Sequence, residues 1–262
     1  MTTIALARHD RSPWPTWLSG PAVYLRTMSV FVVAWEITAV FVGNGLILPA
    51  PHVVAASLVT LLANGSISHN VVVSLERLVV AYAITALVGF PIGLVMGLSR
   101  TGFELIDPIV ELLRPISSIA WIPLALAVLG VGFALPVFIL VYVSIFPLIL
   151  NTVAGVRATD PVLVRAARTM GVPGPTIVRQ IVIPSALPSV LTGVRLSAGL
   201  GWMALIASEL VGAPSGLGWA IQFYSSVFRS ADMVAMIAVV AVLGFATDAL
   251  LRYLQRRITP WA

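Results

Sequence analysis

An uncharged stretch of 42 residues, from Pro115 to Val156, is the feature that most constrains the fold of this chain. Soluble domains are about 25% charged, whereas charged residues make up 10% of this 262-residue chain and hydrophobic residues 59%. A bilayer core about 30 Å thick needs roughly 20 apolar residues per helix. The stretch is too long for one such helix and predicts two, with a turn near Gly130, Gly132 and Pro136. The chain is therefore expected to be a multi-pass integral membrane protein.

The intervals between the other charged residues extend this prediction to an all-α membrane protein with about six transmembrane helices. They predict one membrane domain, residues 22–255, between an N-terminal tail, 1–21, and a C-terminal tail, 256–262. Besides the two helices within 115–156, the expected spans are Thr27–Leu48, Leu78–Leu98, Leu187–Val211 and Met233–Leu251. A short interfacial helix is expected over His52–Ala63, because apolar residues recur there at helical spacing.

Three glycines at every fourth position, Gly89, Gly93 and Gly97, lie on one face of the expected span Leu78–Leu98. Small residues at this spacing let helices approach closely in lipid. This face is predicted to pack against another helix.

The positive charge predicts the orientation. The formal net charge is +5, and all fifteen basic residues are arginines, most of them in short segments between the apolar runs. With six spans, thirteen arginines fall on the side of the two termini, and only Arg77 and Arg229 fall on the other. Cytoplasmic loops are enriched in arginine and lysine, so both termini are expected in the cytoplasm. This placement also accounts for the basic charge without nucleic acid as a partner.

The sequence lacks the residues that several kinds of site require. The chain has no cysteine, and its three histidines, His9, His52 and His69, lie far apart in the sequence, so no metal site is expected. It contains no lysine and no phosphate-binding Gly-x4-Gly-Lys-Ser/Thr loop, so it is not expected to be a nucleotide-hydrolysing enzyme of that type. A membrane-embedded enzyme of lipid metabolism is a weaker alternative because no acidic metal-binding motif is present. A scaffold subunit without a transport pathway is weaker still, because the signature below would then have no purpose.

Arg157–Arg179 is the one long basic segment of mixed polarity between the apolar runs. Within it, Arg165-Ala166-Ala167 is followed after three residues by Gly171, and after nine more residues comes Ile181-Val182-Ile183-Pro184. Physically, the pattern predicts a short helix that ends at Gly171, and a span that begins at Pro184, where proline is tolerated.

This spacing resembles the loop signature of ABC importer permeases, in which Glu-Ala-Ala, a glycine and Ile-x-Leu-Pro occur at the same separations. The resemblance implies that the loop, residues 157–184, couples the permease to its ATPase. The implied coupling residues are Arg165, Ala166, Ala167, Arg168, Gly171 and Pro184. Arg165 stands where the signature has glutamate, so the ionic contact of that glutamate must be absent, reversed or supplied by another residue.

Further strings resemble the taurine, aliphatic sulfonate and nitrate branch of these permeases, and taurine permeases most closely. They include Asp107-Pro108-Ile109-Val110-Glu111, Leu113-Arg114-Pro115-Ile116, Ala207-Ser208-Glu209-Leu210 and Gly216-Leu217-Gly218. The chain departs from the branch after Gly132, where Phe133-Ala134-Leu135-Pro136 replaces a polar turn.

The resemblance implies a type I importer fold in a bacterial inner membrane. It implies a homodimer around one pathway, two cytoplasmic ATPase subunits that bind ATP and Mg, and a periplasmic or lipid-anchored solute-binding protein. The implied substrate is a small anion such as taurine, an alkanesulfonate, nitrate or bicarbonate. A vitamin precursor of the pyrimidine or riboflavin type stays open as the alternative.

Ionisable residues inside spans are functional candidates, because they are costly to place in lipid. Arg195 could attract an anionic substrate, or could pair with Asp248 or extend to the interface. Glu209 could form a gate contact or bond to the glycine-containing loop at 216–218. Trp219 lies in a segment expected to line the pathway or to meet the binding protein. Glu36 is read as facing polar protein or water, or the pathway.

Overall fold

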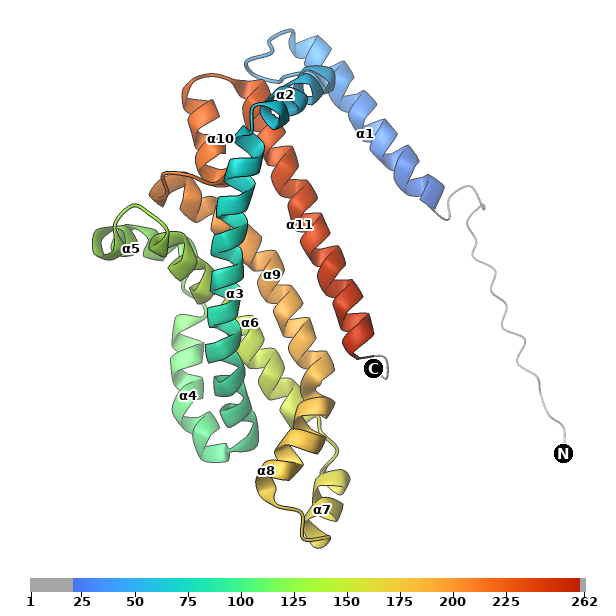
Figure 1. Cartoon of the computed structure of the whole chain (residues 1–262), viewed down its shortest axis with the longest axis vertical. Coiled ribbons are helices and arrows are strands. Elements are labelled where there is room, and N and C mark those ends of the chain that lie inside the picture. The colour runs from blue at the N-terminus through green and yellow to red at the C-terminus, as the bar shows by residue number, and fades with distance from the viewer. Residues whose placement is uncertain (1–20, 260–262) are drawn as a thin grey trace, which may run out of the picture.

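The computed structural model describes residues 21–259, and these residues form helices and turns with no strand. Residues 1–20 and 260–262 lie outside the described part, which leaves out nearly all of the expected N-terminal tail and the last three residues of the C-terminal one. In chain order (Figure 1) the elements are α1 Pro21–Val42, α2 Pro51–Ala63, α3 Ser66–Leu98, α4 Arg100–Leu113, the 3₁₀-helix η2 Ser118–Trp121, α5 Ile122–Leu129, α6 Ala134–Arg157, α7 Pro161–Thr169, α8 Gly174–Ile177, the π-helix η3 Val178–Val182, α9 Ile183–Gly212, α10 Leu217–Ser226 and α11 Ser230–Ile258.

Four stretches of the described chain are long and apolar enough to cross a membrane: α3, α6, the continuous run Gly174–Gly212 and α11. A fifth results if α4 and the segment Ser118–Leu129, which meet at 83°, are taken as one broken span. The all-helical membrane fold is thus confirmed, and residues 21–259 hold four or five stretches that meet these conditions. The helix α1, which covers most of the first expected span, is not counted among them.

The stretch Pro115–Val156 holds one full span, α6, instead of the two expected. The helix α5 has 8 residues, which is about 12 Å and too short to cross a bilayer. It ends at Gly130, whose φ of 71° breaks the helix. The lack of charge correctly indicated an apolar segment, but it could not show that the helix after the bend at residues 114–117 has only 8 residues.

Two other boundaries differ from the prediction. The first helix ends at Val42 rather than Leu48, because Gly43 takes a left-handed φ of 62°. The second span begins at Ser66 rather than Leu78, so Glu76 and Arg77 lie inside α3. Arg77 was read as bounding the span, but it is buried there beside an acidic partner, so its charge does not interrupt the helix.

The core of the bundle is α6, which packs between α3 and α9. A Cβ added to Gly93 of α3 would lie only 2.6 Å from the Cβ of Thr152 on α6, and one added to Gly97 would lie 2.6 Å from the Cβ of Val156. On the other side of α6, a Cβ on Gly155 would lie 2.8 Å from the carbonyl oxygen of Ala186 on α9. The predicted packing role of the glycine face is therefore confirmed.

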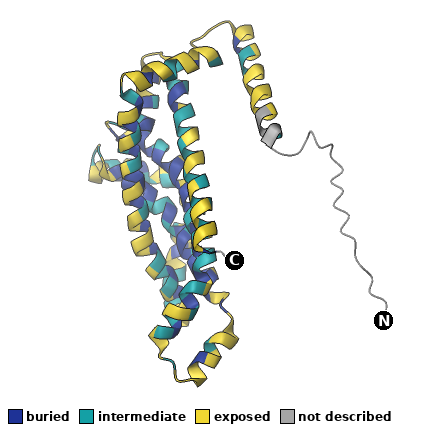
Figure 2. Cartoon of the chain, turned by 45° about the vertical axis from the view of Figure 1, so that its right-hand side comes forward, coloured by how far each residue is buried: buried dark blue, intermediate teal, exposed yellow. Residues whose placement is uncertain are grey.

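The molecule has two distinct ends (Figure 1). The helices α2 and α10 lie at one end, and α7 and α8 project from the other, beyond the turn between α3 and α4. Figure 2 shows that α1 stands apart from the bundle and that exposed residues cover it and the outer side of α11. Apolar side chains such as Phe41 and Phe245 are 86% and 70% exposed on these two helices. Such surfaces suit contact with lipid or with another apolar surface.

Replacement of Gly93 by leucine tests the close contact of α3 with α6. The new side chain would meet Thr152 and the backbone of Ile149, and overpacking of this kind costs about 1–3 kcal/mol or more. Gly244→Leu is the matched control, because a Cβ at Gly244 of α11 meets nothing within 4 Å. Thermal unfolding in detergent should give a lower Tm for Gly93→Leu and a nearly unchanged Tm for Gly244→Leu. Equal melting temperatures would contradict the packing.

Candidate coupling segment and polar groups of the spans

The helix α7 has well-defined caps at both ends. The side chain of Asp160 accepts a hydrogen bond from the backbone N–H of Val162 at 2.7 Å, which caps the N-terminus. At the other end the N–H of Gly171 donates to the carbonyl of Arg168, and that of Val172 donates to Ala167. With a φ of 79° at Gly171, this pair of bonds is a Schellman motif. The predicted end of the helix at Gly171 is confirmed.

The two alanines of the signature lie on different faces of α7. Ala167 is 3% exposed and packs against Ile177 and Val182, whereas Arg165, Ala166 and Arg168 are exposed. Ala166 thus faces outward and Ala167 faces the bundle, and the coupling role of the loop stays a prediction. Consecutive residues are about 100° apart around a helix, so only one of the pair can point outward. The outer face carries apolar side chains beside Ala166, namely Val162, Leu163 and Met170.

Pro184 lies in the first turn of α9, as predicted, and the chain approaches it through a π-helical turn. Proline has no N–H to donate to the carbonyl four residues earlier. In the turn before it, the N–H of Ile183 donates to Val178, five residues back. The whole run Gly174–Gly212 is a single long helix that leads from the α7 end into the bundle.

Near the opposite end, a buried ion pair joins α3 to α9. Arg77 Nη1 lies 2.7 Å from Glu209 Oε1, and the two side chains are 2% and 0% exposed. The hydroxyl of Ser74 donates to the same carboxylate at 2.8 Å. Arg77 Nη1 also donates to the carbonyl of Ser215 at 2.7 Å. A buried ion pair is stable only when further hydrogen bonds replace the lost water. The carboxylate and Arg77 Nη1 have such bonds, whereas Arg77 Nε has none among the described residues.

The chain between α9 and α10 is bonded into this network. The backbone N–H groups of Gly216, Leu217 and Gly218 donate to Asn70, Ser74 and Glu209 respectively, each at 2.9 Å. Gly216 has a φ of 114°, and a Cβ there would lie 2.5 Å from Glu209 Oε1. Of the two roles considered for Glu209, the structure thus shows the bond to the loop.

Arg195 of α9 also has a partner. Its Nε donates to Asp248 of α11 at 2.7 Å, and Asp248 holds Arg252 at the same distance. The pairing with Asp248 is therefore what the structure shows. Trp219 of α10 is half-buried and stacks on Phe223, with ring centroids 5.3 Å apart. Glu36 contacts His52 at 2.9 Å.

Residues 89–260 match the family described as binding-protein-dependent transport system inner membrane component. The chain belongs to this family. It is 35% identical to the taurine transport system permease protein TauC of Escherichia coli over 242 residues, which cover 90% of this chain and 88% of TauC. It is also 35% identical to a putative ABC transporter permease protein of Methanocaldococcus jannaschii over 88% of both chains. The nitrate import permease protein NrtB of Synechococcus elongatus is 26% identical, over 93% of this chain and 94% of NrtB.

Solved structures give the same fold. A chain of the MetNI methionine ABC transporter in an inward-facing conformation superposes with a TM-score of 0.63 at 19% identity, covering 72% of this chain and 94% of that one. A chain of an amino acid ABC transporter gives a TM-score of 0.62 at 21% identity, covering 76% and 98%. The protein is a membrane-spanning permease subunit of an ABC importer. It works with a separate ATPase subunit and a substrate-binding partner, and it is not itself the catalytic subunit.

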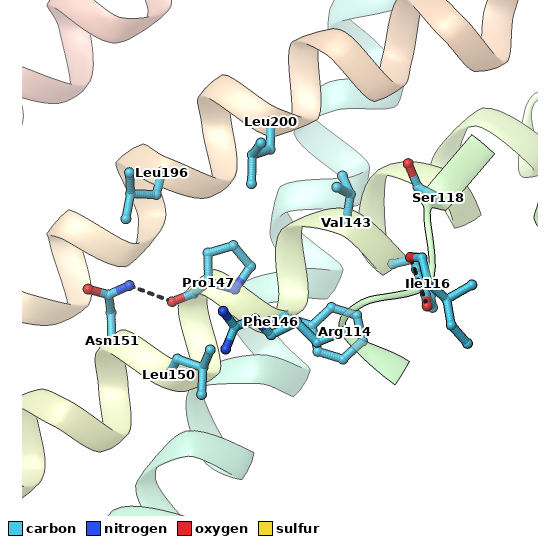
Figure 3. Close-up of a pocket in the computed structure, with 11 residues that line it drawn as sticks. Arg114, Ile116, Ser118, Val143, Phe146, Pro147, Leu150, Asn151, Leu196 and Leu200 are labelled. Carbon is cyan, nitrogen blue, oxygen red and sulfur yellow. Dashed lines mark hydrogen bonds between the residues drawn. The ribbon is translucent and has the colours of Figure 1, made fainter. Parts of the chain in front are cut away.

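The permease has a pocket that the sequence alone did not indicate. It has a volume of about 400 Å³ and lies where the middle of α6 faces α9 and the turn between α4 and η2 (Figure 3). Arg114, Ser118 and Asn151 contribute its polar groups, and Leu196 and Leu200 of α9 contribute apolar ones. Arg114 occurs in one of the strings of the taurine-type resemblance, but its neighbours gave no sign of a cavity. No cluster of metal-binding side chains occurs within residues 21–259.

Replacement of Glu209 by glutamine tests the buried network of the permease. Removal of one partner leaves the Arg77 guanidinium buried and uncompensated, and this costs about 3–5 kcal/mol. The matched control is Glu104→Gln, which breaks the exposed Arg100–Glu104 pair, a kind of pair that contributes little. Thermal unfolding in detergent should show a large fall in Tm for Glu209→Gln only. The double variant Arg77→Met with Glu209→Met should recover part of the loss. Equal melting of both single variants would contradict the network's role.

Proposed function

We propose that two copies of this permease form one pathway that imports a small anion, of the sulfonate or nitrate type, through a bacterial inner membrane. The relatives that carry these substrates in their names support the substrate class. They are TauC for taurine, the putative aliphatic sulfonates transport permease protein SsuC of Escherichia coli at 31% identity, and NrtB for nitrate. The vitamin-precursor alternative has no relative of that name among these three.

The observation that carries the proposal is the exposed outer face of α7. Val162, Leu163, Ala166 and Met170 form an apolar surface at the projecting end, flanked by Arg165 and Arg168. An exposed apolar patch rimmed by charge is typical of a protein–protein contact. This surface is assigned to the groove of the ATPase, with Arg165 available to an acidic group there, which makes the α7 end cytoplasmic. ATP and Mg bind the ATPase and not this chain.

The structure of α7 suggests how a movement at the ATPase reaches the spans. The helix is capped at both ends, and Ala167 fixes it to Ile177 and Val182 at the start of the long run Gly174–Gly212. A displacement of α7 would therefore move this run as a unit. Switching between inward-facing and outward-facing states is assigned to this displacement, biased by the binding of ATP to the partner. Gly171 ends α7, and Pro184 lies near the start of the run that α7 would move.

Replacement of Ala166 by glutamate tests this function. A buried charge at the contact should prevent the ATPase from binding, whereas Thr101→Glu, an exposed substitution at the start of α4 at the same end of the bundle, should not. The measurement is co-purification of tagged permease with its ATPase and binding protein, followed by ATP-dependent uptake of taurine, ethanesulfonate, nitrate or riboflavin into proteoliposomes. Ala166→Glu should lose both the ATPase and uptake.

Two results would contradict the proposal. Normal co-purification and uptake by Ala166→Glu would contradict the role of α7. Uptake of riboflavin, but of none of the three sulfonate or nitrate probes, by the unmodified complex would contradict the substrate class.

A further inference from the structure

Arg114 is the charged group of the pocket on α6, and it has no partner within residues 21–259. The structure shows no ion pair or hydrogen bond for its guanidinium, whereas Arg77 and Arg195 are both held by acidic side chains. In Figure 3 the guanidinium nitrogens of Arg114 point in among the side chains of α6 around Pro147. Arg77 and Arg195 are therefore not free to bind a ligand, whereas Arg114 is.

The pocket lies at mid-depth in the bundle. The lining residues of α6 run from Tyr142 to Asn151 within the helix Ala134–Arg157, and those of α9 are Leu196 and Leu200 within Ile183–Gly212. At 1.5 Å per residue, Pro147 is about 20 Å from the start of α6. A charged side chain at this depth is stable only where it faces a partner or a water-filled cavity. An unpaired guanidinium there indicates an aqueous pathway rather than lipid.

The position of Arg114 is fixed by contacts around it. The hydroxyl of Tyr142 donates to the carbonyl of Leu113 at 2.6 Å, which ties the end of α4 to α6. Tyr142 also packs against Trp121 of η2, with ring centroids 5.6 Å apart. The turn that carries Arg114 is therefore held against α6, so the guanidinium is presented to the pocket by a fixed element rather than by a loose loop.

Further polar groups face the same space. Asn151 donates to the carbonyl of Pro147 at 2.8 Å with one of its two amide hydrogens, and Ser118 contributes a hydroxyl. Val143 also lines the pocket. Because Pro147 has no N–H, the carbonyl of Val143 does not receive the usual helical hydrogen bond from it. Polar groups thus lie on the α4–η2 side and along α6, and the wall on α9 is apolar.

This arrangement selects the class of ligand. The planar fork of an arginine matches the oxygen atoms of an oxyanion, and hydroxyl and amide donors add to it. No acidic side chain lines the pocket among the described residues, so a positively charged ligand would have no ionic partner. The volume of about 400 Å³ suits a small ligand, and Leu196 and Leu200 suit a short carbon chain.

We infer that the Arg114 pocket is an anion-binding subsite of the import pathway, which holds an oxyanion head at Arg114 and any short apolar stem against α9. The inference deepens the proposed function and rests on it. It also makes Arg114 the residue that contacts substrate, in place of Arg195, whose charge is already paired with Asp248.

The test uses the absence of cysteine in this chain. Leu200→Cys places a single thiol on the α9 wall of the pocket, and Val131→Cys places one in the exposed loop between α5 and α6 as the control. The assembled importer, in nanodiscs of phosphatidylcholine, is treated with two thiol reagents of similar size. One is sulfonatoethyl methanethiosulfonate, an anion, and the other is its trimethylammonium analogue, a cation. The labelling rate of this chain is measured on gels.

Relative to the control site, Leu200→Cys should react about tenfold faster with the anionic reagent, the change that one favourable charge contact of about 1.4 kcal/mol gives. Ethanesulfonate or nitrate should slow this reaction. Arg114→Gln should remove the preference, and Arg114→Lys should keep much of it. If Arg114→Gln only destabilised the protein, labelling of Leu200→Cys would change for both reagents alike. Loss of the charge at the pocket should instead change labelling by the anionic reagent relative to the cationic one.

Three results would overturn the inference. One is an unchanged preference of Arg114→Gln for the anionic reagent, and another is no labelling of Leu200→Cys by either reagent. The third is that phosphatidylglycerol in the nanodiscs slows the labelling of Leu200→Cys while free anions do not. The last would make the pocket a site for a lipid headgroup. Anion-selective labelling in an importer that takes up none of the anions would contradict the proposed function, and with it the assignment of the pocket to the pathway. Uptake of anions without selective labelling would overturn the pocket alone.

Discussion

The close approach of α3, α6 and α9 is the constraint on which the rest of this structure depends. Lipid provides no hydrophobic drive for helices to associate, so contact requires small residues that bring backbones together. Here Gly93 meets Thr152, and Gly155 meets the backbone of Ala186. The helix in the middle, α6, therefore has little freedom to move relative to its neighbours. It carries the Arg114 pocket at its centre and leads directly to α7 at its end, so one rigid element connects the two regions assigned to transport.

Glu209, Arg195 and Arg114 differ in whether another side chain balances their charge. This difference distinguishes charges with a structural role from the one assigned to ligand binding. Glu209 receives hydrogen bonds from Arg77, Ser74 and Gly218, which leaves it fully committed to holding the turn before α10. Arg195 is held by Asp248. Arg114 has no such partner and faces a cavity. The cost of a charge in a membrane is met by pairing in the first two cases, and water or a ligand must meet it in the third.

The sequence predicted those features that depend on neighbouring residues. Gly171 ends α7 because a left-handed residue is needed there, Pro184 begins α9, and the glycine face of α3 packs on α6. Features that depend on contacts distant in the sequence could not be predicted. Arg77 looked like the boundary of a span because its partner lies 132 residues away. The helix α5 looked like a full span because charge does not encode that it ends after 8 residues. The Arg114 pocket requires three separate segments, so no local pattern indicates it.

The central proposal is that the α7 end meets the ATPase. Because α10 lies at the opposite end of the bundle, the binding protein is then expected at the α10 end. Cross-linking from single cysteines tests both expectations most directly. Met170→Cys and Phe228→Cys place thiols at residues that are 74% and 76% exposed, one after α7 and one after α10. Each would carry a benzophenone group in the assembled importer, and the cross-linked partner would be identified by mass spectrometry. The account predicts the ATPase from position 170 and the binding protein from position 228. Cross-linking of the ATPase from position 228, or of the binding protein from position 170, would contradict it.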